Sequence, residues 1–113
     1  MRDKVLEIHA RLAEPHVGIE IKGKKTAYTA VNGNMFSFVD PEGRLCIRLS
    51  EPRKAAFNAR HGTGDVIQYN AVMRGYVGVP VAMLGDEKAL AALFAEAVEH
   101  ARGLKPKPTR KQK

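Results

Sequence analysis

The stretch Thr26–Leu49, TAYTAVNGNMFSFVDPEGRLCIRL, decides the fold of this chain. It contains three β-rich runs, at Thr26–Val31, Met35–Val39 and Arg44–Leu49. The first two are separated by Asn32-Gly33-Asn34, which supplies the positive φ angles of a tight hairpin turn. The next turn, Asp40-Pro41-Glu42-Gly43, has proline and glycine where a β-turn favours them. Connections this short join antiparallel neighbours, so we expect an antiparallel meander.

Alternation along these strands predicts which side chains share a face of the sheet. Leu45, Ile47 and Leu49 are expected to face inward, with Arg44, Cys46 and Arg48 on the other side. Phe36 and Phe38 are two residues apart, so both are expected on one face. Met73, Val77 and Val79 have the same parity on a later strand.

Helical patterns flank the meander. Apolar residues recur at helical spacing in residues 2–13 and in about Glu87–Arg102, where Asp86 is the expected cap. Between them, Ser50 can cap a helix that runs to about Arg60 and ends before Gly62. The β-rich composition predicts one or two further strands in Val66–Tyr69 and Val72–Val79.

The resulting order, α-β-β-β-α-β-β-α, is that of a two-layer α+β fold with helices packed on one face of an antiparallel sheet. We expect one domain over residues 1–103 and a flexible basic tail over residues 104–113.

The charge of the chain is concentrated in that tail. The formal net charge is +7 over 113 residues. Residues 1–104 hold 14 of the 19 basic residues and all 12 acidic residues, which is a net charge of only +2. The tail residues that carry the excess are Lys105, Lys107, Arg110, Lys111 and Lys113. Prolines 106 and 108 prevent a helix from running through the tail. It is therefore either a solvated terminus, an arm for nucleic-acid phosphates or a site for an acidic protein.

Several classes of protein are excluded or disfavoured by the composition. A single cysteine excludes an internal disulfide framework and a cysteine-based zinc site. No apolar run approaches the roughly 18 residues of a membrane span. The N-terminal sequence MRDKVLEIHA has no apolar signal core, so we expect a cytoplasmic protein without a membrane partner.

No catalytic, metal or cofactor motif emerges from the sequence. His9, His16, His61 and His100 form no short-range ligand pair, so we interpret them as partly exposed surface side chains. Cys46 has no neighbouring base and is interpreted as an inert thiol. Asp40 and Glu42 are interpreted as a solvated turn. We therefore predict a non-enzymatic protein without a metal or cofactor.

One candidate binding surface is an arginine-bearing face of the sheet. Arg44 and Arg48 share a face of the third strand, and Arg74 and Tyr76 share a parity on a later one. If these strands are neighbours, the four side chains form a basic and aromatic surface suited to a phosphate, a carboxylate or a partner strand. The alternative is the ordinary solvent face of a one-sided sheet.

The chain resembles the TfoX N-terminal domain family. The resemblance covers about residues 20–110 and rests on Gly33, Met35 and Phe36 in the hairpin, Arg48 and Leu49 in the third strand, the helical Phe57, and Tyr76, Val79 and Pro80 at the end of a later strand. It implies a secretion-chaperone-like α+β unit. The namesake proteins are regulators of bacterial competence with a second, C-terminal domain, where the present sequence has its basic tail. The resemblance brings no catalytic residues.

Three function hypotheses follow. The leading one is a regulatory or interaction module with a protein partner. The second is nucleic-acid binding, including DNA, through the tail and the arginine-bearing face. The third is a small-ligand-binding protein or an enzyme with an unrecognised site. A homodimer is an alternative to a monomer, because related folds pair through a sheet or helix face.

Overall fold

The computed structural model describes residues 2–16, 18–23, 27–31, 33–40, 42–64, 66–68 and 71–104. The helices are α1 (Arg2–Ala13), α2 (Glu51–His61) and α3 (Glu87–Arg102), with a short 3-10 helix, η1 (Val81–Gly85), before α3. The strands are β1 (Ala27–Val31), β2 (Asn34–Val39), β3 (Leu45–Arg48), β4 (Ile67–Gln68), β5 (Ala71–Val72) and β6 (Tyr76–Gly78).

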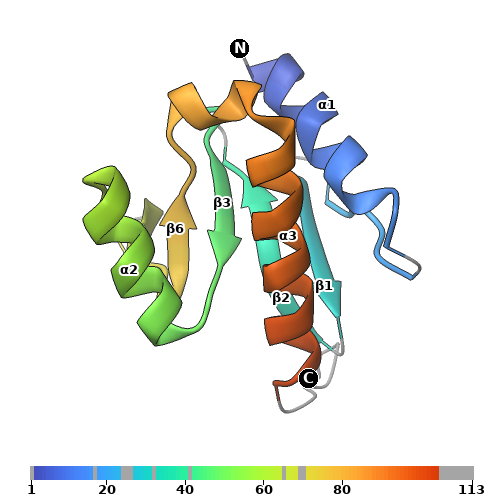
Figure 1. The fold of residues 1–113 in the computed structure, drawn as a ribbon. Coiled ribbons are helices and arrows are strands. Elements are labelled where there is room, and N and C mark those ends of the chain that lie inside the picture. The colour runs from blue at the N-terminus through green and yellow to red at the C-terminus, as the bar shows by residue number, and fades with distance from the viewer. Residues whose placement is uncertain are drawn as a thin grey trace.

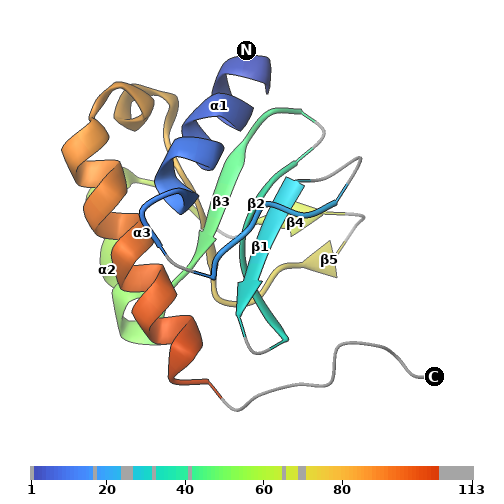
Figure 2. The ribbon, with the colours of Figure 1, turned by 90° about the vertical axis from the view of Figure 1, so that its right-hand side faces the viewer.

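Four of these strands form one antiparallel sheet in the order β1-β2-β3-β6. The three helices lie on one side of it, and the β4-β5 hairpin lies on the other (Figure 2). Within the helical layer, α3 crosses in front of β2 and α2 stands beside β6 (Figure 1). This confirms the predicted α+β fold with helices on one face of an antiparallel sheet.

The ends of the elements follow local signals. The β1-β2 turn is tight, because Val31 pairs with Asn34, and Gly33 between them has a φ of +81°. The Asp86 carboxylate accepts a hydrogen bond from the Ala89 N–H at 3.1 Å and so caps α3, as predicted. Ser50 does occupy the N-cap of α2, but its hydroxyl makes no capping bond.

A bulge in the β1-β2 pair separates the two phenylalanines that were expected on one face. The register shifts between Thr29 and Ala30, which leaves Phe36 as the extra residue of β2. An extra residue reverses the alternation of side chains. Phe36 therefore packs on the helices, with its ring centroid 5.6 Å from that of Phe94 in α3. Phe38 lies on the opposite face, so the expectation of a shared face is wrong.

The region predicted as a strand from Val72 to Val79 is interrupted. A turn at Arg74-Gly75, with a Gly75 φ of +83°, separates β5 from β6. Val77 and Val79 belong to the main core, whereas Met73 packs against the other face of the sheet. The shared parity expected of these three residues is therefore wrong, because the turn resets the alternation.

Two apolar clusters lie on the two sides of the sheet. The main core lies between the sheet and the helices, and Phe36, Leu45, Ile47 and Phe94 are its largest fully buried side chains. A smaller core lies under the β4-β5 hairpin and consists of Phe38, Cys46, Val66 and Tyr76. Neither face of β3 is thus an open solvent face.

Candidate functional site

Tyr76 does not lie at the exposed surface where the strand parity placed it. Its side chain is buried in the small core, with its ring 5.2 Å from that of Phe38. The phenol donates a hydrogen bond to the carbonyl of Met35 at 2.7 Å, and burial raises the pKa of Tyr76. The expectation of an exposed aromatic side chain here is wrong, because Val66 and Met73, which flank the β4-β5 hairpin, pack against this face.

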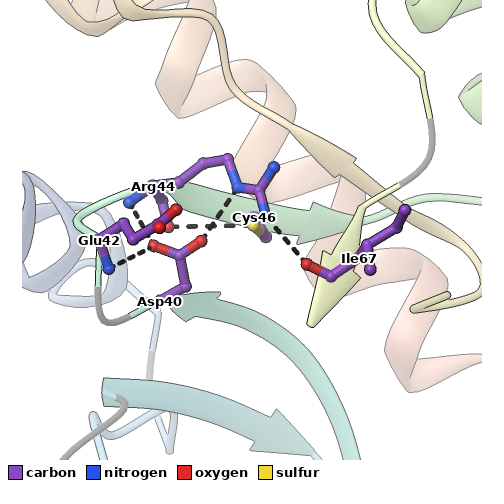
Figure 3. A network of polar contacts seen from close by, with 5 residues as sticks. All are labelled: Asp40, Glu42, Arg44, Cys46 and Ile67. Atoms are coloured by element: carbon purple, nitrogen blue, oxygen red, sulfur yellow. Dashed lines mark hydrogen bonds and ion pairs between the residues drawn. The ribbon is translucent and has the colours of Figure 1, made fainter. Parts of the chain in front are cut away.

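Arg44 lies at the edge of the same core, where it joins the Asp40–Gly43 turn to the hairpin (Figure 3). Its Nε lies 3.0 Å from Asp40 Oδ2, and its Nη2 donates to the Ile67 carbonyl at 3.3 Å. Asp40 also accepts from the backbone N–H groups of Glu42 and Arg44. The expectation that Asp40 lies in a solvated turn is wrong, since its side chain is only 5% exposed. Arg44 thus has a structural role.

Cys46 lies next to this network and is fully buried. Its thiol donates a weak hydrogen bond to the Arg44 carbonyl at 3.9 Å. Burial raises the pKa of the thiol to about 12, which outweighs the opposing effect of the Arg44 charge. Because the thiolate is the nucleophilic form, this cysteine is poorly suited to covalent chemistry.

Arg48, the last residue of β3, and Arg74, in the turn before β6, lie in adjoining parts of the sheet. Arg48 is partly exposed and lies against the chain at Gly75, where an added Cβ would be 3.4 Å from Arg48 Cγ. Arg74 is exposed in the turn before β6. Neither makes an ion pair with any residue in the described ranges. The five basic residues of the predicted tail, Lys105, Lys107, Arg110, Lys111 and Lys113, lie outside the described residues.

His9 forms a buried polar chain with Ser37 and Thr29. His9 Nε2 lies 2.7 Å from the Ser37 hydroxyl, which also bonds the hydroxyl of Thr29. All three side chains are fully buried, and His9 Nδ1 has no hydrogen-bond partner. Burial lowers the pKa of His9 to about 4, so the ring is neutral at physiological pH. The interpretation of His9 as a surface histidine is wrong.

Ser37 beside His9 has the residue types of a nucleophile and its base. Neither side chain has surface available to a substrate, since both are 0% exposed. The hydrogen bonds of Ser37 to His9 and Thr29 instead pair buried polar side chains of α1, β1 and β2 with one another. Among the described residues, no group of three or more His, Cys, Asp or Glu is placed to hold a metal ion.

A groove between α2 and α3 is the surface that sequence reasoning missed. Its volume is about 560 Å³, within the roughly 300–1,000 Å³ of known ligand sites. The groove residues come from both helices, η1 and the segments beside them: Leu49, Arg53, Ala56, Phe57, Arg60, His61, Pro80, Ala82, Met83, Asp86, Ala89, Ala92, Leu93 and Glu96. The two helices have small side chains facing it, and its floor is apolar.

One ion pair bridges the two walls of this groove. Arg53 of α2 donates from Nε to Glu96 Oε2 at 2.6 Å and from Nη2 to Oε1 at 3.1 Å. The hydrogen bonds and charge of Glu96 raise the pKa of the Arg53 guanidinium. The pair is solvent-exposed, with Arg53 61% and Glu96 33% accessible, so it contributes little to stability. It joins a side chain of α2 to a side chain of α3 across the groove.

No protein-family model matches the chain, and neither the curated proteins nor the solved structures searched include a match. In the parts of the chain that are described, no helix is both long enough and apolar enough to cross a membrane.

Proposed function

We propose that this protein is a small non-catalytic interaction module of the bacterial cytoplasm, which binds a segment of a partner protein in the α2–α3 groove. The observation that carries the proposal is the apolar floor of this groove between two helices joined across it by the Arg53–Glu96 pair. Grooves of this form accept an amphipathic helix or an extended segment through a few anchoring side chains.

The chemistry of the reactive side chains supports a binding role over a catalytic one. Cys46 and Tyr76 are buried with raised pKa values, and His9 and Ser37 are enclosed in the core. The resemblance to the N-terminal domain of TfoX-type competence regulators supports a regulatory role for the interaction.

Peptide display on the full-length protein tests this proposal. Peptides selected against the wild type are expected to lose binding when Ala56→Arg places a long side chain in the groove. Ala59→Arg is the matched control, because Ala59 is also an exposed alanine of α2 but does not line the groove. Both changes keep a good helix former, so α2 is expected to persist. Selected peptides that bind both variants equally would refute the groove as the binding site.

Nucleic-acid binding is a second candidate, favoured by Arg48 and Arg74, which make no ion pair with a described residue. Together with the basic residues after 104, they would contact phosphates and release counterions. Retention of DNA or RNA that falls steeply with salt is expected, and Arg48→Glu with Arg74→Glu is expected to weaken it. A chain lacking residues 105–113 would show whether the tail contributes. Binding that is insensitive to both changes would eliminate this candidate.

A further inference from the structure

Along the α2–α3 groove, the acidic side chains have bonding partners, whereas one arginine has none among the described residues. On the α3 side, the Asp86 carboxylate caps the helix and the Glu96 carboxylate is held by Arg53. On the α2 side, Arg60 lines the groove, is exposed and has no ion-pair partner among the described residues. Both acidic groups are thus occupied, while a guanidinium remains free.

Arg60 lies close to the apolar centre of the groove. It follows Phe57 by three residues on α2, so the two side chains are neighbours on one helical face. Phe57 is almost completely buried, and its ring lies 4.4 Å from that of His61. A bound segment that covers this apolar area therefore places its next helical turn beside Arg60.

We propose that the groove selects a partner segment with an apolar anchor and a carboxylate about one helical turn apart, the anchor covering the floor near Phe57 and the carboxylate pairing with Arg60. This inference rests on the proposed function and specifies the chemistry of the partner. An arginine fork pairs with a carboxylate through two parallel hydrogen bonds. Glu96 already shows this arrangement with Arg53 in the same groove.

A peptide fits this groove better than a nucleic acid does. The floor side chains Leu49, Phe57, Met83 and Leu93 are aliphatic or aromatic, so they offer a phosphate backbone no hydrogen-bond donor. Only the arginine side of the groove is attractive to an anion. A single carboxylate on an otherwise apolar segment matches that distribution.

The test uses a display library of peptides of about 15 residues, long enough for the helical turns that span α2. Binders selected on the full-length wild type are expected to share an Asp or Glu three or four positions from an apolar residue. Their affinities, measured by fluorescence anisotropy, are expected to fall about tenfold or more with Arg60→Glu. Arg11→Glu is the control, because it changes the net charge equally at an exposed position of α1 outside the groove.

A second selection, on the Arg60→Glu variant, is expected to exchange the acidic residue for Lys or Arg. Peptides that are blocked by Ala56→Arg but have no acidic preference would overturn this inference and leave the proposed function intact. A selection without any binder blocked by Ala56→Arg would overturn both. An oligonucleotide released by Arg60→Glu, or a dimer in sedimentation that Ala56→Arg dissociates, would assign the groove to a nucleic acid or a second copy and also overturn the inference.

Discussion

Acidification is expected to destabilise this protein through His9. The pKa of the folded side chain is lowered to about 4, against 6.5 for an unperturbed histidine, because the ring is fully buried. As the pH falls below 6.5, the unfolded chain takes up the proton before the folded one does. The stability contributed by the neutral ring is therefore complete above pH 6.5 and is lost as the pH falls to about 4.

The size of the effect follows from these two pKa values. One unit of difference corresponds to about 1.4 kcal/mol, so linkage gives a loss of about 2.5 kcal/mol in the free energy of unfolding between pH 7.5 and pH 4.5. This is a large fraction of the roughly 5–15 kcal/mol that holds a typical domain together. Urea denaturation followed by circular dichroism at the two pH values measures it.

A non-titrating replacement isolates the contribution of His9 from that of other groups. His9→Gln keeps an amide that can bond Ser37, and its pH 7.5 to pH 4.5 difference is expected to be smaller than the wild-type difference by about 2.5 kcal/mol. His61→Gln is the control, because its ring is exposed at the end of α2. Equal pH dependence in the wild type and in His9→Gln would refute the reasoning.

Three further outcomes are expected. A double-mutant cycle with Arg53→Ala and Glu96→Ala, measured by denaturation, should give a small favourable coupling energy. This coupling should disappear at high salt. No coupling at low salt would mean that the ion pair does not join the two helices. Cys46 should resist a thiol reagent at pH 8 in the native protein, because its pKa is raised to about 12. It should react at once after denaturation. Reaction of the native protein at the rate of a free thiol would contradict the burial of Cys46. Tyr76→Phe should cost about 1 kcal/mol of stability through loss of the hydrogen bond to Met35, and an unchanged denaturation midpoint would contradict this.

The parts of the fold that the sequence predicted well are those set by a few adjacent residues. Asp86 caps α3 through an N–H only three residues away, and Gly62 ends α2 with a φ of +66°. The tight β1-β2 turn depends in the same way on Gly33. Phe36 shows the limit of this reasoning, because the bulge that turns it toward α3 depends on how β1 pairs with β2.

The burial of Cys46 and Tyr76 could not be inferred from their strands. Alternation placed Cys46 on the face away from the helices correctly, but that face is covered by Val66 and Met73, on either side of the β4-β5 hairpin. There, β4 and β5 have only two residues each, too few for a period to be recognised. Similarly, the α2–α3 groove depends on the distance between two helices that the sequence predicts separately, and its exposed alanines look like ordinary helix formers.

Strand parity groups Arg44 and Arg48 together, but the fold gives the two side chains different surroundings. Arg44 and Arg48 lie four residues apart on one face of the chain, yet only Arg44 has a carboxylate within reach, because the turn before β3 places Asp40 3.0 Å from its Nε. Arg48 lies instead beside the Arg74 turn, where the described residues offer no acid. Arg60, which no motif singled out, has no ion-pair partner among the described residues for a different reason, since the acidic groups of the groove, Asp86 and Glu96, are already bonded. Which arginines have an ion-pair partner is therefore determined by which turns and helices bring an acid near, and among the described residues Arg60 is left without one beside the apolar floor of the α2–α3 groove.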